Sequence, residues 1–303
     1  MIKQTNFDFV GKRKIWYAIS VIVIIAGIVS LFAQGLNLGL DFTGGNVIQV
    51  QFEQNVQIDD LRNVVNEYVD STPTIQQSDE NNYIIRTQEM SEEDNTAMLS
   101  ELESKFGANE IMRNEKVGAV IGSELISNAK WALILAVILM LVYITIRFKF
   151  NFAISAVVPL LHDVLITVGL FSILQVEVDS TFIAAILTIL GYSINGTIVI
   201  FDRIRENMGK SKKVAFPELV NMSINQTLGR SINTNVAVLI LVICLLIFGG
   251  ASTKSFALAL LIGFVAGCYS SMLIAGPMLS DITHLTGGDK QYKVKNKKVK
   301  AIK

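Results

Sequence analysis

Three ionisable residues lie in or beside long apolar stretches of this sequence. His162 and Asp163 are neighbours near the middle of one stretch, and Arg230 precedes another. An ionisable side chain at the centre of a membrane helix costs at least about 2.5 to 3.5 kcal/mol on insertion scales, so each such group needs a function or a partner. An acid, a base and a cation in these positions are typical of a site that passes a proton or a sodium ion.

Amide and hydroxyl side chains accompany these groups in the same stretches. They are Tyr192, Ser193, Asn195 and Thr197, with Gly191 and Gly196 among them, and Ser231, Asn233, Thr234 and Asn235 after Arg230. Lipid offers such groups no hydrogen bonds, so we expect the polar clusters to face one another between helices.

Two interpretations of the clusters remain open. In the functional one, Asp163, His162 and Arg230 exchange partners as an ion passes. In the structural one, the amides and hydroxyls hold helices together through hydrogen bonds worth about 0.6 kcal/mol each. Packing alone rarely requires an ionisable group, so the functional interpretation is favoured for Asp163 and the structural one for the amides and hydroxyls. Arg230 lies close enough to the membrane surface to extend into it, and both interpretations stay open there.

The residue types do not predict an enzyme. The chain has two histidines, and its two cysteines, Cys244 and Cys268, both lie in apolar stretches, where we expect small packing residues. No nucleophile–base pair or metal-ligand set can be assembled at matching depth. The formal net charge is zero, which gives no indication of a nucleic-acid partner. We therefore expect a transport protein without cofactor or metal.

The elements that carry these residues are membrane helices. Of the residues, 51% are hydrophobic and 17% are charged, against about 25% charged in soluble domains. Six stretches approach the roughly 20 apolar residues that span a bilayer. They are Ile15–Ala33, Ser127–Ile146, Phe152–Leu174, Thr181–Phe201, Ile232–Phe248 and Phe256–Leu279. The first lacks a small-residue cleavage site, so we expect a retained anchor.

Basic residues predict the orientation of the six spans. Of the 26 lysines and arginines, 19 fall in the two tails and in the connections after the second and fourth spans. Basic residues concentrate on the cytoplasmic side, so both termini are expected there. The predicted organisation is a cytoplasmic tail (1–14), the first helix (15–33), an extracytoplasmic domain (34–126), helices two to six (127–280) and a basic cytoplasmic tail (281–303).

The segment between the first two spans has the pattern of an α+β domain. Strands are predicted at Asn46–Phe52, Thr74–Gln77, Tyr83–Thr87 and Glu110–Val117, with helices over Ile58–Val69 and from Ser91 to Phe106. The order β-α-β-β-α-β is that of a ferredoxin-like unit. It contains no histidine or cysteine, so a binding role or a spacer role is expected.

Three smaller features complete the pattern. Gly263 and Gly267, with Ala259 and Ala266, predict close approach of the sixth span to a neighbour. The segment Phe216–Leu228 predicts an interfacial helix between the fourth and fifth spans. The lysine-rich tail from Lys290 to Lys303 predicts an anchor on anionic lipid, with contact to a ribosome or translocase as the alternative.

Several stretches resemble the SecD/SecF family of protein-export membrane proteins. LNLGLDFTGG at Leu36–Gly45 is similar to the signature that SecD and SecF share. Four further stretches resemble the SecF branch in particular. They are LLHDVLITVGLFSI at Leu160–Ile173, FIAAILTILGYSINGTIVIFDRIREN at Phe182–Asn207, SINQTLGRSINT at Ser223–Thr234 and FALALLIGFVAGCYSSMLIA at Phe256–Ala275.

The resemblance implies a fold, partners and a function. It implies six helices that pair with six of SecD in an assembly similar to the resistance-nodulation-division exporters. It also implies association with the SecYEG channel and use of a proton or sodium gradient to help an unfolded preprotein across after SecA has acted. A YidC-type insertase is implied only as an indirect partner. The family-motif positions are Asp41, Phe42, Thr43, Gly44, Gly45, Asp202 and Arg203.

One residue departs from the family pattern. Family members usually carry Asp after the Asn of the GYSIN motif, where this chain has Gly196. The ion-coupling candidates are therefore Asp163, His162, Arg230, Asn195, Gly196 and Asn233, with a carboxylate of SecD as a further contributor. Two alternatives stay open: an exporter of small molecules or lipids with related architecture, since fold does not determine substrate, and a scaffold of the translocase that uses no gradient.

Overall fold

The computed structural model describes residues 7–79, 81–107, 109–210 and 214–287. The predicted lysine-rich anchor from Lys290 to Lys303 lies outside these residues. The chain divides into two compact units, one of which is Leu38–Trp131, while the other holds the membrane helices on either side of it in sequence.

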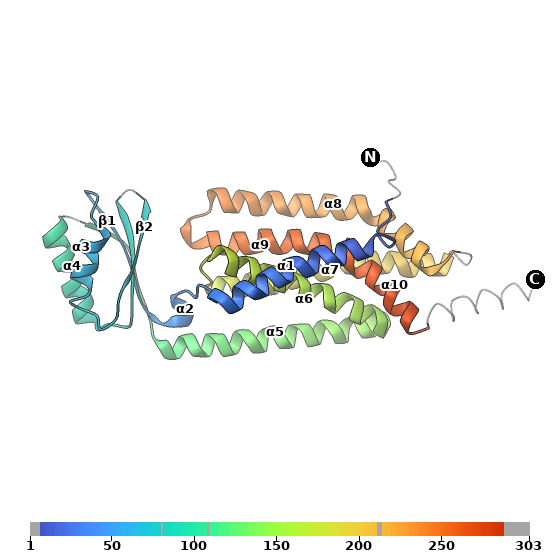
Figure 1. Cartoon of the computed structure of the whole chain (residues 1–303), viewed down its shortest axis with the longest axis horizontal. Helices are drawn as coiled ribbons and strands as arrows, with labels where there is room; N and C mark the ends of the chain where they lie inside the picture. Colours follow the sequence, from blue (N-terminus) through green and yellow to red (C-terminus); the bar gives the residue numbers. More distant parts are fainter. Residues whose placement is uncertain (1–6, 80, 108, 211–213, 288–303) are drawn as a thin grey trace, which may run out of the picture. The chain divides into compact units, whose positions relative to one another are not determined.

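Six helices are long and apolar enough to cross a membrane, which confirms the six predicted spans (Figure 1). They are α1 (Arg13–Gln34), α5 (Ala119–Arg147), α6 (Phe150–Leu174), α7 (Ser180–Lys210), α8 (Phe216–Phe248) and a last span of α9 (Ala251–Ser270), a π-helical segment η1 (Ser271–Ala275) and α10 (Gly276–Leu285). Several helices extend beyond the predicted apolar stretches, because helical hydrogen bonding continues where polar residues reach the membrane surface.

The predicted interfacial helix over Phe216–Leu228 is wrong as a separate element. It forms the first turns of α8, which continues to Phe248 without a break. Pro217 is in the first turn, where its missing N–H does no harm. Gly229 inside the helix costs only about 1 kcal/mol relative to alanine, too little to end it.

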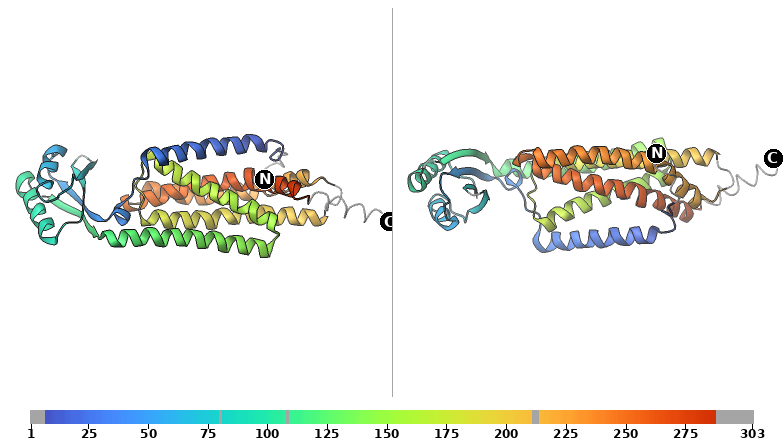
Figure 2. Two further views of the ribbon diagram at one scale, coloured as in Figure 1. Left: turned by 60° about the horizontal axis from the view of Figure 1, so that its bottom comes forward. Right: turned by 90° about the horizontal axis from the view of Figure 1, so that it is seen from above.

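The most buried part of the helical unit is the packing of α6, α7 and α9, with α1 against α6 and α8 against α9 (Figure 2). Glycines permit the closest approaches. A methyl group on Gly27 of α1 would lie 2.8 Å from the Cα of Gly169 in α6. A methyl group on Gly263 of α9 would lie 2.2 Å from Ile189 of α7, which confirms the predicted close approach of the sixth span.

Two prolines disturb the helices close to polar residues. Pro159 lies inside α6, one turn before His162 and Asp163. The π-helical segment η1 is separated from Pro277 only by Gly276. Because Pro277 has no N–H for the carbonyl four residues earlier, the regular ladder cannot continue there. Such π segments often occur at functional sites.

The second unit confirms the predicted order β-α-β-β-α-β. Its elements are the short α2 (Leu40–Thr43), β1 (Gly45–Phe52), α3 (Ile58–Val65), β2 (Thr74–Asp79), β3 (Asn82–Thr87), α4 (Glu92–Phe106) and β4 (Asn109–Val117). The strands lie in the order β2-β3-β1-β4, and all neighbours are antiparallel. Alternate residues of β1, including Ile48 and Val50, pack with Leu61 of α3 and Met98 of α4 in one buried cluster. Helix α3 ends four residues earlier than predicted.

The two glycines of the LDFTGG motif turn the chain from α2 into β1. Gly44 has φ 68° and Gly45 has φ 118°, values that L-residues with side chains rarely adopt. A methyl group on Gly45 would also lie 2.2 Å from the carbonyl oxygen of Thr87. The turn therefore requires both glycines of the motif. Phe42, which precedes them in the motif, is buried.

Candidate functional site

Asp163 lies in a fully enclosed polar site between three helices. Its side chain is 0% exposed. One carboxylate oxygen, Oδ2, accepts hydrogen bonds from Ser193 of α7 at 2.6 Å and from Ser270 of α9 at 2.8 Å. The other, Oδ1, lies 2.8 Å from Nδ1 of His162. Both oxygens are thus engaged, as a buried carboxyl group requires.

His162 continues this site toward α1. Its Nε2 lies 3.0 Å from the hydroxyl of Ser20, and its ring stacks on Tyr269 with a centroid distance of 5.9 Å. Tyr269 is also 3.3 Å from the Ser20 hydroxyl and donates to the carbonyl of Trp16 at 2.7 Å. Helices α1, α6, α7 and α9 therefore share one connected set of hydrogen bonds.

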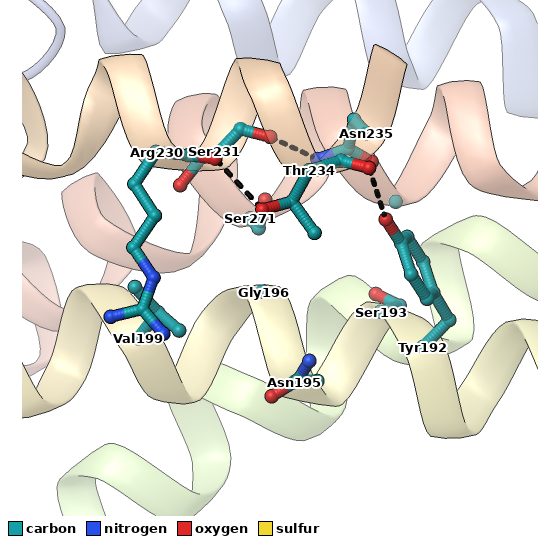
Figure 3. A pocket seen from close by; sticks show the side chains of 11 residues that line it. Tyr192, Ser193, Asn195, Gly196, Val199, Arg230, Ser231, Thr234, Asn235 and Ser271 are labelled. Carbon is teal, nitrogen blue, oxygen red and sulfur yellow. Dashed lines mark hydrogen bonds between the residues drawn. The ribbon is translucent and has the colours of Figure 1, made fainter. Parts of the chain in front are cut away.

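A polar pocket lies on the other side of α7, between α7, α8 and the last span (Figure 3). Its volume is about 60 Å³, room for several water molecules since one needs about 10–15 Å³. The lining residues are Tyr192, Ser193, Asn195, Gly196, Val199, Arg230, Ser231, Thr234, Asn235, Gly267 and Ser271. The predicted facing of the α7 and α8 polar clusters is confirmed by this pocket.

Arg230 is the cation of this pocket. Figure 3 shows it reaching from α8 toward α7, beside Val199. Within the described part of the chain, its guanidinium forms no ion pair. The buried Oδ1 of Asn235 likewise accepts no hydrogen bond from the described residues. Among the described residues, the pocket thus has an exposed cation without an ion-pair partner and a buried acceptor without a donor.

Gly196 lies where a carboxylate would enter this pocket. A methyl group there would be 3.4 Å from Oγ and 3.5 Å from Cβ of Ser271, close to ordinary contact, so a side chain fits at this position. Because the lining residues include no aspartate or glutamate, the pocket has the basic member of an acid–base pair without the acidic one.

Asp163 and the pocket are separated by one layer of small residues. Ser193 lines the pocket and donates to Asp163. Gly267 also lines it, and a methyl group on Gly267 would lie 3.5 Å from Oδ2 of Asp163. Ser193 and Gly267 therefore separate Asp163 from the pocket that Arg230 lines, unlike the direct exchange of partners expected from the sequence.

The remaining predicted positions lie elsewhere. Asn233 is exposed on α8 and does not line the pocket, whereas Asn235 does. Asp202 lies 2.8 Å from Arg205 and 3.6 Å from Arg147. Arg203 donates to Gln226 at 2.6 Å. These contacts lie within α7 or join it to α5 and α8, and they form no part of the buried site.

Sequence reasoning missed the contributions of α1 and α9. Single hydroxyls in a membrane span usually bond to their own helix. The sequence alone therefore does not single out Ser20, Tyr269, Ser270 or Ser271. The available signal was the run Tyr269–Ser270–Ser271 beside the small residues of the last span. Among the described residues, no group of three histidines, cysteines or acidic residues could hold a metal.

Comparison with known families identifies the chain. Residues 97–284 match the model of protein export membrane protein SecD/SecF, C-terminal, and residues 29–56 match the SecD/SecF GG motif. The second match contains the Gly44–Gly45 turn described above. The first covers more than half of the chain and includes Asp163, Gly196 and Arg230.

Relatives extend this similarity to nearly the whole chain. The protein translocase subunit SecF of Sebaldella termitidis is 44% identical, with coverage of 95% of this chain and 96% of the relative. SecDF of Bacillus subtilis is 41% identical over 89% of this chain but only 37% of its own length. A crystal structure of SecDF from Thermus thermophilus matches with a TM-score of 0.82 and 34% identity, over 90% of this chain and 38% of that one. This chain belongs to the SecD/SecF family of protein-export membrane proteins.

Proposed function

We propose that this chain is a SecF-type accessory subunit of the Sec protein translocase and acts in complex with a SecD subunit. The observation that carries the proposal is the pattern of coverage. The chain matches 96% of a SecF relative but only 37% of a SecDF relative. In that relative the part that matches this chain is joined to a longer remainder, which supports a SecD part as the partner of this chain.

The subunit lies in the bacterial plasma membrane with both termini in the cytoplasm. The concentration of 19 of 26 basic residues in the tails and in two connections supports this orientation. The α+β domain then lies outside, where it binds the emerging, unfolded preprotein. The complex works beside the SecYEG channel after SecA, with a YidC-type insertase as an indirect partner.

Ion coupling, in this proposal, uses both sides of the wall formed by Ser193 and Gly267. Asp163 supplies a group that can gain or lose a proton, and Arg230 supplies the charge that responds across the pocket. Proton movement at Asp163 changes the charge of a fully buried site, and the field of that charge reaches the pocket that Arg230 lines. Gly196 makes this route depend on Asp163 and on a carboxylate that SecD contributes.

The test is preprotein translocation into vesicles that contain SecYEG, SecD and this chain, with and without an imposed ion gradient. The original chain is compared with Gly196→Asp and with Gly196→Asn, a neutral side chain of the same shape. Gradient-dependent completion by the original chain, lost in Asp163→Asn, is the expected result. A response confined to Gly196→Asp would identify an uncoupled scaffold. Unchanged stimulation in Asp163→Asn would contradict the role of that carboxyl.

A further inference from the structure

The hydrogen bonds between α1, α6 and α9 have directions that chemistry determines. The carbonyl of Trp16 can only accept, so Tyr269 donates its one hydroxyl hydrogen there, at 2.7 Å. Tyr269 must then accept from Ser20 at their 3.3 Å contact. The single hydroxyl hydrogen of Ser20 is therefore committed to Tyr269.

This direction determines which ring nitrogen of His162 carries hydrogen. Since Ser20 has no hydrogen left to donate, it accepts from Nε2 of His162 at 3.0 Å. A neutral imidazole with its hydrogen on Nε2 has a bare acceptor at Nδ1. Yet Nδ1 lies 2.8 Å from Oδ1 of Asp163, and two acceptors do not make a hydrogen bond.

With Ser20 donating to Tyr269 rather than to His162, one proton lies between the side chains of His162 and Asp163. Either a protonated Asp163 donates to Nδ1, or an imidazolium donates to an ionised Asp163, and the pair has no net charge in both cases. The groups facing the pair are Ser20 from α1, Ser193 from α7, and Ser270 and Tyr269 from α9. Within the described residues, no lysine, arginine or second carboxylate lies in ion-pair reach of it.

We propose that His162 and Asp163 form a site that holds one proton, and that Ser20 is the positioning residue that keeps it there by accepting from Nε2. This proposal goes beyond the proposed function. It rests on that function only for the role that the proton has in transport. When the proton leaves through Nε2, the carboxyl hydrogen moves to Nδ1 and Asp163 becomes an anion. Nε2 is then an acceptor, and the Ser20 hydroxyl turns from Tyr269 to His162.

The consequence is a mechanical one. Release of the proton from α6 breaks the hydrogen bond between Ser20 of α1 and Tyr269 of α9. Rebinding restores it. The protonation state of a site next to the polar pocket is thereby communicated to the packing of the first and last spans.

The experiment observes the hydrogen on the His162 ring directly. The chain has two histidines, His162 and His284, so ¹⁵N-histidine labelling of full-length His284→Gln in lipid bilayers leaves one imidazole for solid-state NMR. At neutral pH, Nε2 is expected to carry hydrogen. In Ser20→Ala, Nε2 should lose its hydrogen, and Nδ1 should carry the one hydrogen that remains between His162 and Asp163. Ser20→Thr keeps the hydroxyl and should restore the original pattern.

Ser270→Ala is the matched control, because it removes a hydroxyl from Asp163 but leaves Nε2 with its acceptor. It should leave the Nε2 hydrogen in place. A bare Nε2 in the original chain would overturn the proposal, as would identical spectra of Ser20→Ala and the original, or the same shift in Ser270→Ala. The spectra do not depend on transport, so failure of gradient coupling would refute the proposed function without affecting this result.

Discussion

Both units of this protein have an apolar core, but they differ in where their charged groups and their exposed apolar side chains lie. In Leu38–Trp131 the interior is apolar, as at Ile48 and Leu61, and the charged side chains lie at the surface. In the helical unit Asp163 is fully buried, while Ile146 and Phe248 are more than 80% exposed. The difference follows from the surroundings: water rewards burial of apolar groups, whereas lipid leaves polar groups unsatisfied unless they meet inside.

The cost of losing a polar contact differs between the two units. Glu101 and Lys105 in the α+β unit (Leu38–Trp131) form a surface pair that water screens. Asp163 is fully buried, so no solvent replaces a contact that it loses. Removing a charge from the helical unit should therefore have a much larger effect than removing one from the α+β unit.

The largest effect is expected for Asp163→Ala. It leaves His162 and the Ser193 and Ser270 hydroxyls without their partner, and loss of one member of a buried pair costs about 3 to 5 kcal/mol. Chemical denaturation in detergent micelles measures the loss. The control is Asp59→Ala, which removes an exposed ion pair with Arg62 in the α+β unit. Equal losses in both variants would remove the contrast between the units.

The next largest effect is expected for Gly45→Ala. It should lower the free energy of unfolding of the α+β unit by about 3 kcal/mol. The substitution combines a strained φ with a clash against Thr87, each worth about 1 to 3 kcal/mol. Hydrogen exchange of β1 and β3 in the full chain would report it. Gly107→Ala has a positive φ but nothing within 4 Å, so it isolates the strain. If both variants exchange alike, the close approach to Thr87 has no energetic role.

Gly27→Ala should destabilise the helical unit by about 2 kcal/mol, because the added methyl group meets the backbone of Gly169 and separates α1 from α6. Thermal unfolding in micelles measures it. Gly191→Ala is the matched control, since a methyl group there meets nothing within 4 Å. A helix-interior alanine is otherwise favoured over glycine, so this control should be neutral or slightly stabilising. Destabilisation by both would show that helix glycines matter for another reason.

The smallest effect is expected for Glu101→Gln. Hydrogen bonds from Lys105 and then Tyr68 lower the pKa of the Glu101 carboxyl. A carboxyl whose pKa is lowered on folding adds stability above its ordinary pKa and loses it as the pH falls through the lowered value. Denaturation of the original and the variant should therefore differ slightly at neutral pH and converge in acid. A difference that grows in acid would reverse the sign of this contribution.

The fold of the α+β unit was predictable because the sequence patterns that begin and end its helices and strands are local. Ser91 was expected to begin a helix, and its hydroxyl accepts from the backbone N–H of Asp94 at 3.0 Å. Gly107 ends the same helix. Helix α3 ends at Val65, although Tyr68 and Val69 still pack on the core from the turns that follow. Apolar periodicity alone could not distinguish those turns from helix.

The candidate site was predictable only in part. The sequence identified Asp163, His162 and the α7 cluster, because ionisable and amide groups stand out in an apolar stretch. It did not identify Ser20 or Ser270, since the value of a hydroxyl depends on what it meets across the helix interface. It also placed Asn233 in the site where the structure places Asn235, because the face of a long helix is set by its packing.

The sequence by itself determined the six spans, the α+β domain between the first two, and the presence of costly ionisable groups, because length, polarity and periodicity are properties of short segments. Only the tertiary structure decided that Ser193 and Gly267 separate Asp163 from the pocket that Arg230 lines, and that Ser20 and Tyr269 complete the buried site. The physical reason is that hydrogen-bond partners in a membrane protein are chosen by the crossing of helices far apart in the chain.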